Sequence, residues 1–325
     1  MPEDPRVPSP PAETETPAPK KNFQSGFVAI LGRPNAGKST LVNRLVGQKI
    51  AIVCSKPQTT RNRIQGIVNR PGGQIVLVDT PGLHRPDSAL GRQMMREVRD
   101  ALEGIDVLLL MTDASRALPV ADEMLLERAQ AFGGPVILAL NKIDCMPKPK
   151  LLPLMDVYGR SFAFAAIVPI SALTGAGTGE LLDEIQSRLP AGQPYFPEDQ
   201  VTDQPERFLA AEIVREKAIR LTYHEVPHAL AVVVDRYEES PKILRIYATM
   251  HVERDSQKKI LIGSGGDMLK RIGTSARQEL EKLLGVKIFL GLFVKVLPGW
   301  RDDPRRVRDL DWHWQLEDRS GPDES

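Results

Sequence analysis

The segment from Gly32 to Ser39 has glycine, lysine and serine at the spacing GxxxxGK[ST], which could hold phosphate groups. Gly32 and Gly37 permit a tight turn whose backbone N–H groups point at phosphate oxygens, and the helical stretch that follows adds its positive N-terminal end. The Lys38 ammonium could pair with β- and γ-phosphates, and the Ser39 hydroxyl could bind Mg²⁺, which prefers oxygen ligands. The sequence therefore predicts a phosphate-binding loop of Gly32, Arg33, Pro34, Asn35, Ala36, Gly37, Lys38, Ser39 and Thr40.

A turn made of Asp79, Thr80, Pro81 and Gly82 follows the apolar run IVLV. Because a carboxylate at the end of a strand lies at the sheet edge where doubly wound folds bind ligands, Asp79 is predicted to hold Mg²⁺ through water. Gly82 lacks a Cβ, so its N–H could lie against a γ-phosphate and move away when that phosphate leaves. Taken alone, this segment could equally be an ordinary turn at the end of a strand.

Two further segments, also at the ends of apolar runs, could recognise a base. In Asn141-Lys142-Ile143-Asp144, the Asp144 carboxylate could accept hydrogen bonds from guanine N1 and N2, whereas adenine would leave it desolvated and unpaired. Asn141 is predicted to fix the loop and approach the N7 side of the base, and the Lys142 stem to cover its face. The N–H of Ala172 would complete the pocket within the segment Ser171, Ala172 and Leu173. The predicted ligands are therefore GTP and GDP.

These segments need a scaffold that brings strand ends together. Short apolar runs from Phe27 onward alternate with stretches of helical spacing, such as Asp122 to Phe132, which is typical of a mostly parallel sheet with helices on both faces. We expect an α/β P-loop domain over residues 25–192, after a disordered, proline-rich tail at 1–24. A linker at 193–206, a small α+β domain at 207–300 and a C-terminal tail at 301–325 complete the prediction.

The expected α+β domain contains Gly263-Ser264-Gly265-Gly266 between two predicted helices. This is the arrangement of a KH domain, whose GxxG loop clamps the backbone of single-stranded nucleic acid, although GxxG alone would more often be a simple turn. Residues 251–300 carry four more basic than acidic side chains, whereas the whole chain has 43 basic and 42 acidic ones. Any nucleic-acid affinity must therefore come from a local patch. The predicted RNA contacts are Lys258, Lys259, Gly263, Ser264, Gly265, Gly266, Lys270 and Arg271.

With its four nucleotide-binding segments, its PQTTR stretch at residues 57–61 and its KH-like domain, the chain resembles the Era family of ribosome-assembly GTPases over about residues 25–300. The resemblance implies that Thr60, in the first switch loop, reaches Mg²⁺ and the γ-phosphate, so the implied metal ligands are Ser39, Thr60 and Asp79. It also implies binding to the 3′ end of 16S rRNA and a role in 16S rRNA processing and biogenesis of the 30S small ribosomal subunit. Family members often carry a basic residue where this chain has Ser264 and Gly265, which predicts weaker or more salt-sensitive RNA binding.

Hydrolysis is expected to be slow, because many switch GTPases orient the attacking water with a glutamine where this chain has Leu83. The predicted catalytic residues are Lys38, Thr60 and Gly82, with an unassisted rate on the order of 10⁻⁴ to 10⁻² s⁻¹. Asn35 either shapes the loop or recruits a monovalent cation such as K⁺, as related GTPases do. His84 is assigned no proton-transfer role, since phosphoryl transfer needs little base catalysis.

Cys54 and Cys145 are too few for a disulfide framework, so we expect reduced thiols, with Cys145 packed, in a monomeric cytoplasmic protein. No apolar run reaches the ~18 residues of a membrane span, so any contact with the inner face of the cell membrane is predicted to be peripheral. Two alternatives stay open: a related GTPase acting in tRNA modification or on another ribosomal particle, and a nucleotide-gated scaffold whose turnover is incidental.

Overall fold

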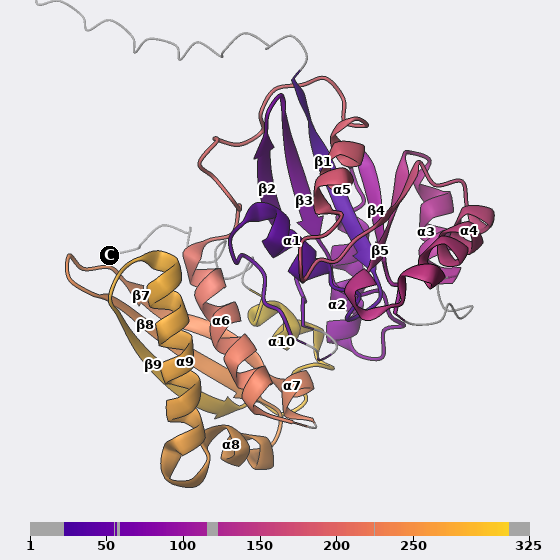
Figure 1. Cartoon of the computed structure of the whole chain (residues 1–325). Coiled ribbons are helices and arrows are strands. Elements are labelled where there is room, and N and C mark those ends of the chain that lie inside the picture. Colours follow the sequence, from indigo (N-terminus) through magenta and orange to yellow (C-terminus); the bar gives the residue numbers. More distant parts are fainter. Residues whose placement is uncertain (1–22, 55, 57–58, 116–122, 224, 312–325) are drawn as a thin grey trace, which may run out of the picture.

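The computed structural model of the chain describes residues 23–54, 56, 59–115, 123–223 and 225–311. Its N-terminal domain is built on a six-stranded sheet in the order β2-β3-β1-β4-β5-β6 (Figure 1). All neighbouring strands are parallel except β2, which is antiparallel to β3. The strands are β1 (Gln24–Gly32), β2 (Ile64–Arg70), β3 (Gly73–Asp79), β4 (Val107–Asp113), β5 (Val136–Asn141) and β6 (Ala166–Pro169). The predicted mostly parallel sheet is confirmed.

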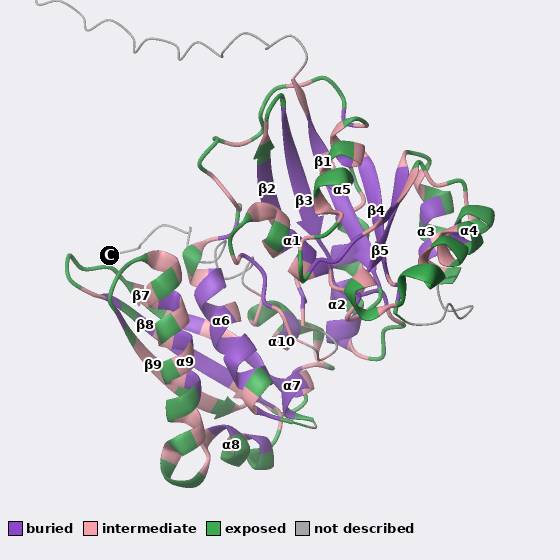
Figure 2. Ribbon diagram, in the orientation of Figure 1, coloured by how far each residue is buried: buried purple, intermediate pink, exposed green. Residues whose placement is uncertain are grey.

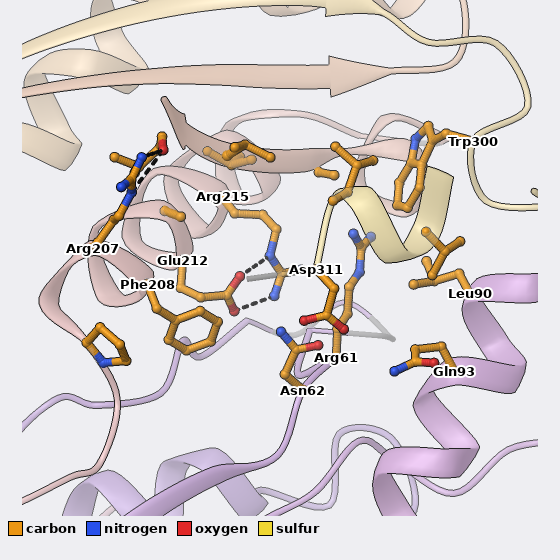
Figure 3. A pocket seen from close by; sticks show the side chains of 18 residues that line it. Arg61, Asn62, Leu90, Gln93, Arg207, Phe208, Glu212, Arg215, Trp300 and Asp311 are labelled. Atoms are coloured by element: carbon orange, nitrogen blue, oxygen red, sulfur yellow. Dashed lines mark hydrogen bonds and ion pairs between the residues drawn. The ribbon is translucent and has the colours of Figure 1, made fainter. Parts of the chain in front are cut away.

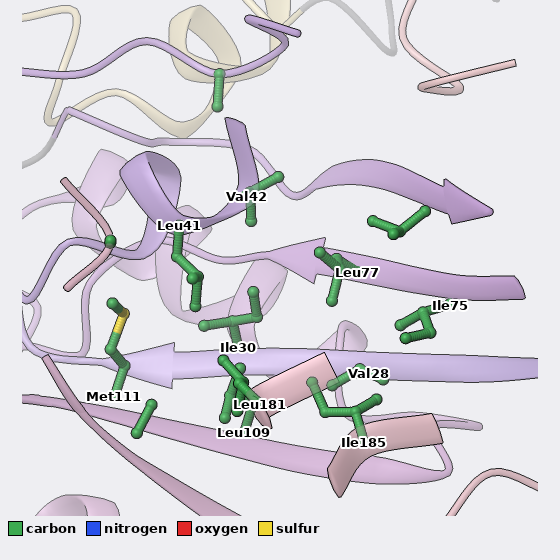
Figure 4. Close-up of a cluster of buried hydrophobic side chains, with 14 of the residues drawn as sticks. Val28, Ile30, Leu41, Val42, Ile75, Leu77, Leu109, Met111, Leu181 and Ile185 are labelled. Atoms are coloured by element: carbon green, nitrogen blue, oxygen red, sulfur yellow. The ribbon is translucent and has the colours of Figure 1, made fainter. Parts of the chain in front are cut away.

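Helices cover both faces of this sheet. Helices α1 (Lys38–Val46) and α5 (Thr178–Gln186) pack on one face, where their leucines meet Val28 and Ile30 of β1 (Figure 4). Helices α2 (Ala89–Asp100), α3 (Glu123–Phe132) and α4 (Leu151–Ser161) pack on the other face, against Ala29 and Leu31. Successive β1 residues alternate between the two cores, so the central strands are apolar throughout. Two short 3₁₀ turns, Ile143–Cys145 and Lys148–Lys150, follow β5.

The C-terminal domain has a three-stranded sheet in the order β7-β8-β9, with β7 antiparallel to β8 and β8 parallel to β9. The strands are β7 (Ala231–Glu238), β8 (Leu244–Val252) and β9 (Ile288–Val296). Helices α6 (Glu206–Leu221), α8 (Asp255–Ile262) and α9 (Asp267–Leu284) share one apolar core with this sheet, and a 3₁₀ turn, Ser264–Gly266, joins α8 to α9. The predicted small α+β domain is confirmed.

Several elements differ from the sequence-based expectation. A short helix, α7 (Val226–Ala229), precedes β7 and was not predicted; Pro227 favours the first turn of a helix. Helix α10 (Pro304–Asp309) lies within the predicted C-terminal tail, and β1 begins at Gln24, within the predicted N-terminal tail. Residues 1–22 and 312–325 of the two tails lie outside the described residues, as do Asp122, Pro57 and Gln58.

The two domains share packing contacts. Helix α6 is buried along most of its length, because one side packs on the C-terminal core and the other faces the N-terminal domain (Figure 2). Phe208 and Leu209 of α6 belong to the core of the N-terminal domain. A separate apolar cluster joins Leu90 and Met94 of α2 to Trp300 and Val307 at the C-terminal end of the chain. The predicted linker also packs against the N-terminal sheet, since the Ile67 N–H donates to Val201 O over 2.9 Å.

Candidate functional site

The predicted phosphate loop leads from β1 into α1, and its backbone is tightly constrained. Asn35 (φ 64°) and Gly37 (φ 104°) take left-handed conformations, and a Cβ added to Gly37 would lie 2.3 Å from Nδ2 of Asn141. Lys38 is only 6% exposed, and its Nζ donates to Gly32 O (3.1 Å) and Arg33 O (3.3 Å). Burial lowers the pKa of Lys38 to about 8. Burial thus disfavours the charged form of Lys38, and an anionic ligand bound here would stabilise the positive charge of its ammonium group.

The three implied metal ligands meet beside this loop. Ser39 Oγ lies 2.7 Å from Thr60 Oγ1 and donates to Asp79 Oδ2 over 2.7 Å. Asp79 is fully buried, its Oδ1 has no hydrogen-bond partner among the described residues, and burial raises its pKa to about 6. A buried carboxylate oxygen next to two hydroxyls suits a hard divalent cation that keeps part of its water shell. In the described part of the chain no group of three or more His, Cys, Asp or Glu forms an all-protein metal site.

Gly82 lies directly against the phosphate loop. A Cβ added to Gly82 would lie 2.7 Å from Pro34 N, and the next residue donates its N–H to Gly32 O over 3.1 Å. That residue, Leu83, is buried in the apolar core between the sheet and α2, so its side chain cannot hold a water. His84 Nδ1 donates to Gly82 O, 2.9 Å away, in the tautomer that carries a proton on Nδ1. Thr80 and Pro81 are buried, and Thr80 Oγ1 donates to Ile30 O.

The predicted base-binding segments are joined by Asn141. Its Nδ2 donates to Ala36 O (2.7 Å) and its Oδ1 accepts from the Ala172 N–H (2.9 Å), so one amide ties the phosphate loop to the Ser171–Leu173 segment. The Ala172 N–H, predicted to face the base, is thus engaged within the protein. Lys142 has a left-handed backbone (φ 67°), and its Nζ lies 2.6 Å from Asp113 Oδ2.

The Asp144 carboxylate is exposed, and a hydrogen bond from Ser171 is the main reason why its pKa lies below the usual range. It is therefore charged at neutral pH and, because it is exposed, can accept further hydrogen bonds. Cys145 is exposed rather than packed, because it lies in the 3₁₀ turn after β5, and its Sγ donates to Asp144 Oδ2 over 3.2 Å. That bond raises the pKa of the Cys145 thiol, which makes it a poor nucleophile. Ile143 is half-buried, and Leu173 is 67% exposed.

The phosphate site is also lined by residues that could not be selected from the sequence. The cavity beside Lys38 and Thr60 is also lined by residues of the segment after α1, namely Ile52, Val53, Cys54 and Lys56. These residues carry no motif, and only their place between the phosphate loop and Thr60 could have suggested a role. Asp113, the partner of Lys142, was also missed, although it ends strand β4 at the same sheet edge.

The GxxG loop of the C-terminal domain has an open geometry. Gly263 (φ 75°), Gly265 (φ 58°) and Gly266 (φ 84°) all have positive φ angles, which favour glycine, and Ser264 is exposed. A Cβ on Gly263 would lie 2.8 Å from Met268 N, whereas Cβ atoms on Gly265 and Gly266 would meet nothing within 4 Å. The backbone of this loop is therefore accessible to an extended ligand.

The predicted basic RNA contacts fall into two groups. Lys258 and Lys259 lie on α8, where Lys259 is exposed and Lys258 half-buried. Lys270 and Arg271 are exposed on α9 and line a shallow depression shared with Lys217 and Arg220 of α6. The structure therefore does not gather the four predicted cations into one depression. It instead brings two of them next to cations of α6 that the sequence analysis did not select.

Comparison with known families agrees with both sites. The family described as "50S ribosome-binding GTPase" matches residues 27–142, and the KH domain family matches residues 225–301. The chain is 51% identical to the GTPase Era of Geobacter sp. (strain M21) over 292 residues, which are 90% of this chain and 98% of that protein. It is 50% identical to the GTPase Era of Syntrophus aciditrophicus (strain SB), over 90% of this chain and 96% of that protein.

Two solved structures are similar along nearly the whole described chain. One is a variant of Aquifex aeolicus Era bound to GDP and AlF₄⁻, with 44% identity and a TM-score of 0.85. The other is Era in complex with MgGDPNP and nucleotides 1506–1542 of 16S ribosomal RNA, with 44% identity and a TM-score of 0.86. Each match covers 88% of this chain and 98% of the other. This chain is therefore a GTP-hydrolysing enzyme with a P-loop domain followed by a KH domain, and it belongs to the Era family of GTPases.

Proposed function

We propose that this protein is a GTP-driven switch that binds the 3′ end of 16S rRNA and assists 16S rRNA processing and biogenesis of the 30S subunit. The observation that carries the proposal is the convergence of Ser39, Thr60 and Asp79 in a chain that also presents an open GxxG loop. A related Era structure holds MgGDPNP and a 16S rRNA segment at the same time, which supports both halves of the proposal.

In this proposal Lys38 pairs with the β- and γ-phosphates, and Asp144 accepts from the guanine edge. Ser39, Thr60 and Asp79 would hold Mg²⁺, which bridges phosphate oxygens and neutralises developing charge when it is bound. The buried Asp79 Oδ1, which has no other partner among the described residues, fits that role. Thr60 would connect the metal site to the first switch loop, and the Gly82 N–H would connect the γ-phosphate to the turn after β3.

Slow hydrolysis follows from the burial of Leu83, because no side chain at this position can orient the attacking water. Catalysis would then depend on Lys38, Thr60 and the Gly82 N–H, which stabilise charge on the γ-phosphate. We include K⁺ as a cofactor bound through Asn35. Hydrolysis should then be several-fold faster in potassium than in sodium at equal ionic strength, and Asn35→Gly, which tolerates the left-handed backbone, should remove the difference. Equal rates in both salts would leave Asn35 a structural residue.

The RNA would lie with its backbone against the GxxG loop and near the cations of α8 and α9. Ser264 and Gly265 add no charge, so RNA affinity should fall steeply with salt, as expected when surrounding lysines and arginines supply the attraction. We place the protein in the cytoplasm as a monomer, with membrane contact limited to the periphery. None of the helices in the described residues is long and apolar enough to cross a membrane.

Two measurements test this function. Crosslinking the protein to RNA in cells and sequencing the bound fragments should recover the 3′ end of 16S rRNA above other RNAs. Single-turnover GTP hydrolysis should be slow alone and faster with small ribosomal subunits. Recovery of tRNA or of large-subunit rRNA would favour one of the alternatives, and an unchanged rate with subunits would favour a nucleotide-gated scaffold.

A further inference from the structure

The domain interface contains a partly open cavity that the proposed function does not use. It lies between α2, the segment after Thr60, α6, β7 and α10 (Figure 3). About 80 Å³ is available to the centres of water molecules, several times the roughly 10–15 Å³ that one water needs. The cavity therefore has room for a small organic molecule. Its apolar lining comes from both domains and includes Leu90 of α2, Phe208 and Ala211 of α6, Val232 of β7 and Trp300.

Arg61, from the end of the PQTTR stretch, is held rigidly in the wall of this cavity. Its Nη1 donates to Leu230 O (2.8 Å), its Nη2 donates to His228 O (3.2 Å), and its guanidinium carbon lies 5.5 Å from the ring centre of Trp300. The side chain is 9% exposed, yet its Nε has no hydrogen-bond partner among the described residues. The two Nη atoms thus hold the guanidinium in place, and the buried Nε–H remains without an acceptor.

Arg215, from α6, lines the same cavity and also has one buried nitrogen without a hydrogen-bond acceptor. Its Nε and Nη2 each donate to the Glu212 carboxylate over 2.6 Å, as the dashed lines in Figure 3 mark, and Nη2 also donates to Thr59 O. The residue is 2% exposed, and its Nη1 has no acceptor in the described part of the chain. A buried donor without an acceptor costs free energy that a suitable ligand could recover.

The charges around the cavity favour an anion. Three arginines and two carboxylates line it, and one of those carboxylates, Glu212, is already engaged by Arg215. Burial, and next the charge of Arg215, lower the pKa of Arg61 to about 9; the Glu212 carboxylate acts in the opposite direction, and Arg301 lowers it further. Arg301 is itself neutralised by Glu253, 2.7 Å away. Positive charge is therefore in excess next to an apolar wall.

We propose that this cavity binds a small oxyanion, a carboxylate or a phosphate, carried on an apolar or aromatic body. The oxyanion would accept from Arg61 Nε and Arg215 Nη1, and the body would lie against the apolar wall near Trp300. Such a ligand contacts both domains at once. It therefore stabilises their present arrangement and links a small molecule to the position of the first switch loop, which contains Thr60 and Arg61.

The test uses the full-length protein saturated with Mg·GDP, so that the phosphate loop is occupied. Phenyl phosphate is titrated by isothermal calorimetry, with benzoate as the carboxylate probe. We expect a Kd on the order of 1 mM for the better of the two, as is usual for ligands of this size. Inorganic phosphate, which lacks the body, and phenol, which lacks the charge, should each bind at least about tenfold more weakly. No binding of either aromatic anion at about 10 mM would overturn the proposal.

Two variants locate the site. Arg61→Lys keeps the charge but loses the Nε donor, and it should weaken binding at least about tenfold, whereas Arg92→Lys on the exposed side of α2 should change nothing. Because Arg61 also bonds across the interface, Ala211→Met provides a second route: it fills the cavity while leaving both arginines in place. GDP affinity and circular dichroism confirm folding. Wild-type affinity in both Arg61→Lys and Ala211→Met would place the probe elsewhere and refute the assignment.

Discussion

The phosphate loop and the GxxG loop both place left-handed glycines immediately before a helix, but they are built in opposite ways. At Gly37 an added Cβ would collide with Asn141, and Lys38 beside it is buried. At Gly265 and Gly266 an added Cβ would meet nothing within 4 Å. The phosphate loop is sterically closed and fits one kind of ligand. The GxxG loop is open, so its binding depends on how closely a ligand approaches its backbone and on the charges nearby.

The largest effect should come from Gly37→Ala. The left-handed conformation costs about 1–2 kcal/mol for a residue with a Cβ, and displacement of Asn141 breaks two buried hydrogen bonds, so GDP affinity should fall about a thousandfold. Gly47→Ala is the matched control, because Gly47 (φ 80°) ends the same helix with nothing near its Cβ position. Fluorescent-GDP titrations measure both. Equal GDP affinity in the two variants would contradict the interpretation that the phosphate loop is sterically closed.

Asp144→Asn should have the next largest effect. An amide cannot accept both bonds from guanine, and each hydrogen bond to a charged group contributes about 1.5–3 kcal/mol, so GTP affinity should fall about a hundredfold. Xanthine nucleotides, which present an acceptor at that edge, should become the preferred ligands. Asp156→Asn on α4, another exposed carboxylate, is the control. Competition between GDP and XDP provides the measurement, and a retained preference for guanine would remove the base-reading role from Asp144.

For the open loop, Gly266→Asp should weaken RNA binding about tenfold through its negative charge, while GTP affinity stays unchanged. Gly285→Asp separates charge from backbone strain, since Gly285 (φ 71°) is equally open and lies at the far end of α9. Titration of a labelled RNA with the 3′-end sequence of 16S rRNA gives both affinities. Normal binding by Gly266→Asp would refute the role of this loop in RNA recognition.

The two loops could be predicted from sequence because their chemistry is local: a few consecutive residues determine each glycine turn and its helix. The role of α6 could not be predicted this way. Its polar residues Arg215, Glu216 and Lys217 are buried, which a helical pattern alone does not explain. Their partners lie far away in the sequence, at Thr59, Val53 and Glu279. The use of the Ala172 N–H by Asn141 was likewise hidden, because it depends on how two loops meet.

These α6 contacts clamp the segment that leads to Thr60. The Val53 N–H donates to Glu216 Oε2 over 3.1 Å, Arg220 Nη2 donates to Val53 O over 2.8 Å, and Lys56 Nζ donates to Ile219 O over 2.5 Å. If GTP draws Thr60 toward its γ-phosphate, the segment must pull on α6, which shares the C-terminal core with α9. The closed site and the open site would then be coupled, and by thermodynamic linkage each would change the affinity of the other by the same factor.

The smallest predicted effect tests this coupling. RNA should bind about fivefold more tightly with a non-hydrolysable GTP analogue than with GDP, at the lower end of the usual range for coupled sites. Arg220→Ala removes the hydrogen bond to Val53 O, and it should lower the ratio of RNA affinities in the two nucleotide states by about twofold. Arg277→Ala is matched to it, since Arg277 also forms an i,i+4 pair with a glutamate but has no hydrogen bond or ion pair to the N-terminal domain among the described residues. RNA titrations in each nucleotide state, and nucleotide titrations with and without RNA, must give the same factor.

Equal RNA affinity in both nucleotide states of the wild-type protein would show that the two sites act independently. An unchanged ratio in Arg220→Ala would exclude the Arg220–Val53 hydrogen bond as the route between them.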